Sequence, residues 1–108
     1  MVKQGDIIKL NFDPQLGHEQ SGYRPALVVT KDTFNQKLKM AIACPITNAD
    51  KENPLHVQLD SRTETTGFVM CDQIKSLDLV ARPHKVIEKI PRDLLKQVCD
   101  IIIAEIEV

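Results

Sequence analysis

The sequence predicts a small, mainly β protein in which bent antiparallel strands form a sheet or partly open barrel and one helix closes the chain. Two observations lead to this fold class. Short runs of Ile, Val and Leu recur between polar turns that contain Gly and Pro, which favours strands. From Leu94 to Ile106 the apolar residues recur at helical spacing instead. Because the chain has 108 residues, 43% of them hydrophobic, we expect one domain over residues 1–108 with a single modest core.

The first half of the chain contains three predicted strands. A mixed apolar pattern predicts a strand over 6–12, and the continuous apolar run at 26–30 predicts a strand buried on both faces. The polar stretch 31–39 predicts a turn or a short helix. A third strand is expected over 40–46, where Pro45 lacks a backbone donor and therefore indicates a sheet edge or a bulge.

The second half contains shorter strands and the closing helix. Alternation of apolar and polar residues over 55–60 predicts a half-buried strand, and a turn follows that ends at Gly67. We expect a strand over 68–74 and a short extended piece over 85–90. Pro91 stands where the first position of a helix is expected. The apolar stripe of that helix consists of Leu94, Leu95, Val98, Ile101, Ile102 and Ile106, extended by Ile103.

The connection between the first two strands is the most informative segment of the chain. It is long and polar, and long connections inside a compact domain are usually functional or disordered. Pro14 and Pro25 stiffen its two ends, which argues against disorder. We therefore expect this loop to hold a ligand at the end of a small sheet.

Arg24 and Thr47 are the first two candidate functional residues. Arg24 precedes Pro25, which biases it towards extended geometry, and the planar fork of a guanidinium suits a phosphate. Thr47 follows the third strand, where its hydroxyl can donate to a phosphate oxygen or cap the loop backbone. The start of the second strand and the end of the third lie at one edge of an antiparallel sheet, so these residues are expected to be neighbours. Taken singly, an exposed hairpin Arg and a capping Thr are the more common explanations.

Three residues of the loop add candidate chemistry. His18 titrates near neutrality and can serve as an acid or base, although most loop histidines are simply exposed. Glu19 can accept a proton or orient Arg24. Gln20 offers a donor and an acceptor, which suits the reading of a base edge.

Composition excludes several other classes of protein. The net charge of −1 excludes a uniformly basic nucleic-acid binder. Cys44, Cys71 and Cys99 have no metal-ligand spacing and lie among apolar neighbours, so we expect buried free thiols in a reducing cytoplasm and no bound metal. The N-terminus shows no export segment, and the apolar run Ile101–Ala104 is too short to span a membrane. Phosphate-binding glycine loops and nucleophile elbows are absent from the sequence, and no cofactor is expected.

Several segments occur in the order of a known family. Gly17–Pro25 reads GHEQSGYRP and Asp72–Leu77 reads DQIKSL; they are accompanied by Gly5-Asp6-Ile7, Phe12-Asp13-Pro14 and Pro45-Ile46-Thr47. Together these segments resemble the MazF/PemK family of toxin endoribonucleases, the messenger-RNA interferases of bacterial type II toxin–antitoxin systems.

The resemblance implies a fold, an activity and partners. It implies a small SH3-like barrel of the CcdB/PemK type, a homodimer, and sequence-selective, metal-independent cleavage of single-stranded RNA. It also implies a cognate antitoxin whose partly disordered chain occupies the RNA groove. Arg24 and Thr47 match two catalytic positions of the family. The loop residues Glu19 and Gln20, beside His18, match a segment connected with activity and substrate binding, and Tyr23 stands where some relatives carry His.

In such an enzyme the nucleophile is the 2′-OH of the RNA, so the protein supplies positioning, charge stabilisation and proton transfer. An arginine is a poor base because its pKa lies above ~12, so Arg24 is assigned to charge stabilisation. The base stays open between Glu19, His18 and water. Two other classes are kept as alternatives: a CcdB-like gyrase poison and a non-catalytic SH3-like binding module. The first bears a C-terminal Trp, whereas this chain has no Trp and ends Ile106-Glu107-Val108.

Overall fold

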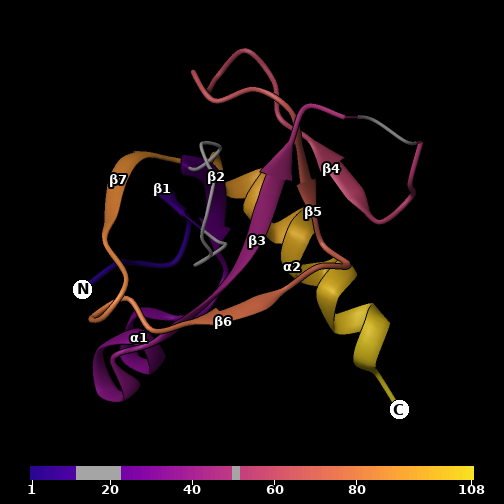
Figure 1. Cartoon of the computed structure of the whole chain (residues 1–108). Helices are drawn as coiled ribbons and strands as arrows, with labels where there is room; N and C mark the ends of the chain where they lie inside the picture. Colours follow the sequence, from indigo (N-terminus) through magenta and orange to yellow (C-terminus); the bar gives the residue numbers. More distant parts are fainter. Residues whose placement is uncertain (12–22, 50–51) are drawn as a thin grey trace.

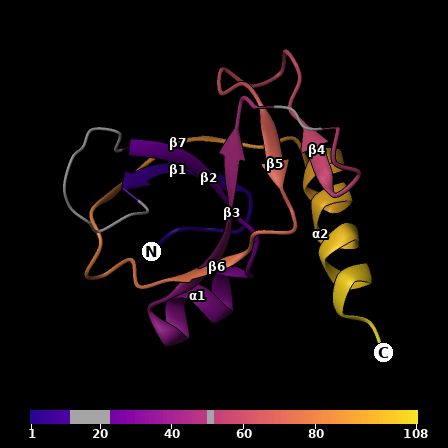
Figure 2. The same cartoon turned by 45° about the vertical axis from the view of Figure 1, so that its right-hand side comes forward.

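The computed structural model describes residues 1–11, 23–49 and 52–108, and Figures 1 and 2 show the arrangement of their strands and helices. In chain order the elements are β1 (Asp6–Asn11), β2 (Tyr23–Val28), α1 (Asp32–Leu38), β3 (Ala41–Thr47), β4 (His56–Gln58), β5 (Phe68–Met70), β6 (Lys75–Leu77), β7 (His84–Lys89) and α2 (Arg92–Ile106).

The strands form one antiparallel sheet that does not close into a barrel. Its strand order is β4-β5-β3-β2-β1-β7, with β6 also paired to β3. In the part of the chain that the structure describes, this path ends at β4 on one side and β7 on the other. The helix α2 runs beside β4 and β5, while α1 lies near β6 (Figure 2). The predicted fold class, mainly β with a C-terminal helix, is confirmed; SH3-like is a loose description of this open, bent sheet.

β3 changes its partner partway along its length. Its beginning, Ala41–Ala43, pairs with β6, and its end, Ile46 and Thr47, pairs with β5, while β2 lies on its other side. Pro45 falls where the pairing with β6 has ended and the pairing with β5 has not begun. The prediction of an edge strand at Pro45 is therefore wrong, because a missing donor is tolerated in a central strand where the partner changes.

The two faces of the sheet bury two different apolar clusters. One cluster gathers residues of all the long strands against α2, including Leu27, Ile46, Val69 and Val98. The other lies on the opposite face and includes Leu10, Ala26, Ala43 and Leu77. Alternate residues of β2 and β3 contribute to different clusters, as the two-residue period of a strand requires.

Most departures from the predicted elements are shifts of boundaries. β2 begins at Tyr23 rather than at Ala26, since Pro25 needs no donor where it faces Lys9 of β1. The strand expected over 68–74 ends at Met70, and the segment after a short turn forms the separate strand β6. In α2, Leu94 and Val98 are buried, but Ile103 and Ile106 are 57% and 69% exposed, so the predicted apolar stripe is covered only in its first half. Pro91 precedes the first residue of that helix, and its backbone carbonyl accepts from Leu95 N.

The turn after β4 is tied to the start of α2. The Arg62 guanidinium donates to Asp60 at 2.8 Å and to both Asp93 oxygens at 2.9 and 3.0 Å. These hydrogen bonds lower the pKa of Asp93 and of Asp60 below the ordinary value for aspartate. Among the described residues, no helix combines the length and apolar character needed to cross a lipid bilayer.

Candidate functional site

The register of β2 and β3 brings Arg24 and Thr47 to one edge of the sheet. Ala26 lies opposite Pro45, and Val28 lies opposite Ala43. Partner numbers run in opposite directions in an antiparallel pair, so the same register, continued two residues along each strand, sets Arg24 opposite Thr47. Residues directly opposite each other point to the same face. Arg24 is exposed, and Thr47 is half-buried.

Thr47 performs the local capping that its position predicted. Its Oγ1 accepts a hydrogen bond of 3.1 Å from the backbone N of Ala49 and so holds the start of the following loop. Accepting this bond uses one lone pair, and the hydroxyl hydrogen stays available as a donor. Capping and donation to a ligand are therefore compatible roles for one hydroxyl.

The backbone of Thr47 is fixed by the turn that precedes β5. Gly67 has φ +118°, and a Cβ there would overlap the Thr47 carbonyl oxygen and lie 2.9 Å from the carbonyl carbon. Next to it, Thr66 Oγ1 donates to Asn48 Oδ1 at 3.0 Å. Only glycine permits this close approach of the turn to the end of β3.

That turn is held in turn by a carboxylate on β7. Glu88 accepts hydrogen bonds from Thr65 N at 2.7 Å, Thr65 Oγ1 at 2.6 Å and Glu64 N at 3.1 Å. Partial burial raises the pKa of Glu88, but these three hydrogen bonds outweigh it and leave the pKa below its ordinary value. Glu88 is therefore charged at neutral pH and holds the turn that supports Thr47.

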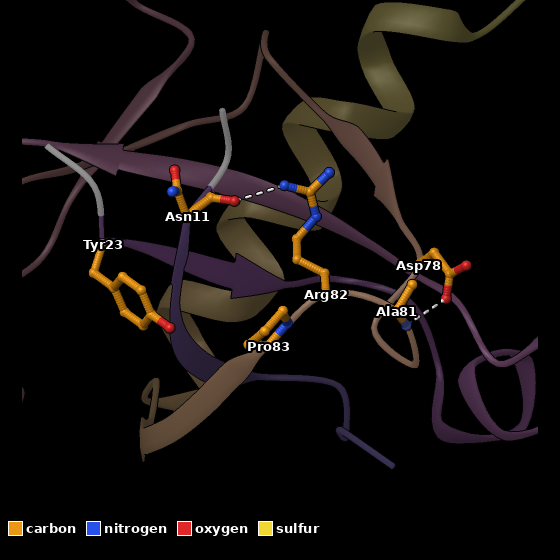
Figure 3. Close-up of a pocket in the computed structure, with 6 residues that line it drawn as sticks. All are labelled: Asn11, Tyr23, Asp78, Ala81, Arg82 and Pro83. Atoms are coloured by element: carbon orange, nitrogen blue, oxygen red, sulfur yellow. Dashed lines mark hydrogen bonds between the residues drawn. The ribbon is translucent and has the colours of Figure 1, made fainter. Parts of the chain in front are cut away.

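Tyr23 lies on the face of the sheet opposite to Arg24, since the two residues are adjacent in β2. Its ring is 59% exposed and lines two hollows. One, of about 740 Å³, extends over Lys9, Pro25 and Asn48. The other, of about 430 Å³, lies at the end of β1, where Arg82 Nη1 donates to the Asn11 carbonyl at 2.6 Å (Figure 3).

The other candidates from the sequence lie outside the described residues. These are His18, Glu19 and Gln20, together with the rest of the segment 12–22. The structure therefore brings Arg24 and Thr47 together and sets Tyr23 on the other face of the same strand.

The cysteines offer no activated thiol. Burial raises the pKa of Cys71 to about 12 and moves the pKa of Cys44 higher still. Partial burial also raises the pKa of Cys99. All three are free, with Cys44 and Cys71 buried and Cys99 half-buried. In the residues that the structure describes, no three His, Cys, Asp or Glu side chains are grouped to hold a metal ion.

Sequence reasoning missed a polar hollow beside Thr47. It has a volume of about 350 Å³, and its lining includes Thr47, Asn53, His56, Met70, Asp72 and Gln73. The His56 side chain is only 7% exposed, and its Nε2 lies 3.5 Å from Asp72 Oδ1. His56 is isolated in the sequence, but pairing of β4 with β5 places it opposite Met70, two residues before Asp72. The only signal available was the segment Asp72–Leu77, which the resemblance contains.

Comparison with known proteins follows from this geometry. The model of a family described as PemK-like, MazF-like toxin of type II toxin–antitoxin system matches residues 3–105. The chain is 36% identical over 101 residues to endoribonuclease PemK of Escherichia coli, covering 90% of this chain and 76% of that protein. It is 40% identical over 78 residues to endoribonuclease toxin MazF of Escherichia coli strain K12, covering 72% and 69%.

Solved structures give the same answer. The crystal structure of MazF from Deinococcus radiodurans superposes with a TM-score of 0.86 at 34% identity, over 99% of this chain and 97% of that one. A MazE–MazF crystal structure from the same organism gives a TM-score of 0.87 at 35% identity, over 96% and 94%. The match runs over nearly the whole chain in sequence and in structure, and the chain therefore belongs to the PemK-like, MazF-like family of type II toxin–antitoxin toxins.

Proposed function

We propose that this protein is a toxin endoribonuclease that cleaves single-stranded RNA at selected sequences, without a metal ion or other cofactor. One observation carries the proposal: the register of β2 and β3 sets Arg24 and Thr47 on the same face at one edge of the sheet. A guanidinium and a hydroxyl donor in that arrangement suit a phosphodiester. Membership of a family with curated endoribonucleases supports the same reaction.

The chemistry needs no nucleophile from the protein. The 2′-OH of the RNA attacks the adjacent phosphorus, a bond forms between O2′ and phosphorus, and the bond from phosphorus to the 5′ oxygen breaks. The products are a 2′,3′-cyclic phosphate and a 5′-OH. Arg24 stabilises the charge on the non-bridging oxygens, and Thr47 donates to the same phosphate. The proton of the 2′-OH passes to Glu19, to His18 or to water.

The partners follow from the same proposal. MazE–MazF complexes are among the structural relatives, so we expect a cognate antitoxin to neutralise this chain. We also expect a homodimer, because Ile103 and Ile106 leave apolar surface uncovered at the end of α2. Light scattering should then give about twice the chain mass of 12.2 kDa, and a strict monomer would contradict this. We expect the protein to act in the cytoplasm, where RNA and reducing conditions for its free thiols are both present.

Site variants with matched controls test the activity. Arg24→Ala and Thr47→Ala should each lower the rate of RNA cleavage by about 10² or more, as loss of a transition-state donor does elsewhere. Arg92→Ala and Thr33→Ala replace exposed residues of the two helices and should leave the rate unchanged. Thermal unfolding of all four variants shows that they fold. Full cleavage activity in well-folded Arg24→Ala and Thr47→Ala would sink the proposal.

A further inference from the structure

The hollow beside Thr47 combines polar groups that protein packing leaves unsatisfied. Among the described residues, His56 Nδ1 is buried and has no hydrogen-bond partner. Its other nitrogen, Nε2, lies 3.5 Å from Asp72 Oδ1, which is too long for a strong hydrogen bond. An apolar residue would fill this position between β4 and β5 without leaving a polar atom unpaired, so stability does not explain a histidine here.

Asp72 faces the same hollow and has unused acceptor capacity. Asn53 Nδ2 donates to its Oδ2 at 3.4 Å, a long contact, and its side chain is 27% exposed. An ionised carboxylate accepts hydrogen bonds through two oxygens and donates none. Gln73, also on the lining, adds an exposed amide with one acceptor and two donors.

The charge of the lining selects the class of ligand. Asp72 is negative, and the lining residues include no Lys or Arg, so a phosphate would be repelled. His56 and Asp72 are two potential metal ligands, and no third lies with them in the described part of the chain. A planar heterocycle with hydrogen-bond donors fits better. Its ring can rest on the Met70 thioether, because sulfur makes favourable contacts with aromatic rings.

Thr47 connects the hollow to the site described above. It lines the hollow and faces the same side of the sheet as Arg24. A phosphate held by Arg24 and Thr47 would therefore have a flanking nucleotide within reach of Asp72 and His56. Recognition of single-stranded RNA reads base edges of this kind in hollows between loops.

We propose that this hollow is a base-reading subsite, which takes a nucleobase bearing an exocyclic amino group next to the scissile phosphate and disfavours uracil. This inference rests on the proposed ribonuclease function. Adenine, cytosine and guanine each carry an amino group that can donate to Asp72. Uracil has carbonyl oxygens on both sides of its single N–H, and these would face the carboxylate.

The test reads base preference rather than total activity. The 5′ ends of fragments from a randomised RNA pool give the base preference of the wild type at each position around the cut. At one flanking position the wild type should disfavour uracil about tenfold or more. Asp72→Asn replaces one acceptor oxygen by a donor and should bring uracil to within about threefold of the other bases. Gln73→Ala, at an exposed position, should change the preference at the same position. Asp100→Asn, on the outer surface of α2, is the matched control and should change nothing.

A second measurement separates this inference from the proposed activity. Binding of a 2′-methoxy RNA pool, which lacks the nucleophile, reports base preference without cleavage. If the wild type cleaves RNA but Asp72→Asn keeps every base preference, the subsite is refuted and the ribonuclease stands. If the wild type binds the pool with the expected preference but never cleaves RNA, the subsite stands and the activity is refuted. A wild type that neither binds nor cleaves single-stranded RNA refutes both.

Discussion

Gly67 packs against the carbonyl group of Thr47 so closely that no side chain fits between them. The contact joins the turn before β5 to the last residue of β3, and Thr47 is also paired there with Phe68. The position of the Thr47 hydroxyl at the sheet edge therefore depends on a residue that takes no part in chemistry.

Gly67→Ala should lower both stability and cleavage activity. The added methyl group overlaps the Thr47 carbonyl, and alanine at a positive φ costs about 1–2 kcal/mol by itself. Gly5→Ala is the matched control, because Gly5 also has a positive φ, of +92°, but its Cβ would lie 3.4 Å from the flexible Leu95 side chain. Urea unfolding should show a loss in both variants, and only Gly67→Ala should lose RNA cleavage under conditions where it is folded. Equal activity of the two folded variants would show that the close packing does not position Thr47.

Glu88→Gln should destabilise the protein at neutral pH but not in acid. The pKa of Glu88 is lowered on folding, so its charged form stabilises the fold above the ordinary glutamate value of about 4.3. That contribution is lost as the pH falls through the lowered pKa. From the loss of charged hydrogen bonds we expect a difference of roughly 1–2 kcal/mol in the free energy of unfolding at pH 7. The difference should shrink below about pH 4.

The control for this experiment is Glu105→Gln, which removes a carboxylate from the exposed side of α2. Its free energy of unfolding should differ little from that of the wild type at either pH. If the Glu88→Gln difference were constant from neutral to acid pH, the carboxylate charge would not be what holds the turn at Glu64 and Thr65.

Alkylation should distinguish the three cysteines. Iodoacetamide reacts with thiolates, and burial raises the pKa of Cys71 to about 12 and that of Cys44 further. At pH 8 the native protein should therefore acquire at most one label, slowly and at the half-buried Cys99, whereas all three cysteines should react in concentrated urea. Peptide mass spectrometry locates the labels. Native labelling of Cys44 as fast as Cys99 would contradict the buried packing, and loss of RNA cleavage on labelling Cys99 alone would assign that thiol an unforeseen role.

RNA cleavage should persist in excess EDTA and should require the 2′-OH at the scissile position. Arg24 can supply the positive charge that Mg²⁺ provides in metal nucleases, so chelation should leave the rate unchanged. An RNA with a single 2′-deoxy or 2′-methoxy sugar at the cut should resist cleavage, because the attacking group is gone. Gel analysis of end-labelled substrate measures both. Activity that EDTA abolishes and Mg²⁺ restores, or efficient cleavage of the 2′-deoxy substrate, would contradict the mechanism.

The sequence was sufficient for features that depend on local pattern and simple topology. The period of two around Val57 and the helical spacing from Leu94 onwards predicted elements that the structure contains. The antiparallel rule alone placed the starting end of the strand after Pro25 beside the finishing end of the strand that contains Pro45. The register of β2 and β3 agrees with that placement.

Features that depend on packing between distant segments were not predictable. The hollow around His56 exists because β4 pairs with β5, and nothing near His56 in the sequence indicates Asp72 as its neighbour. The exposure of Ile106 was missed for a related reason. Helical spacing shows which side chains share a face, but not how far along the helix the sheet extends to cover them.

The alternation of faces along β3 has a consequence for genetic screens. Ile46 lies in the core against α2, and its neighbour Thr47 points to the opposite face at the sheet edge. In cells that survive only when the toxin is inactive, substitutions at either codon would pass selection. Survivors at codon 46 should contain little protein, because the chain misfolds and is degraded, whereas survivors at codon 47 should accumulate it. Scoring abundance together with growth across a mutant library would thus sort adjacent codons into scaffold and active surface without any further structure.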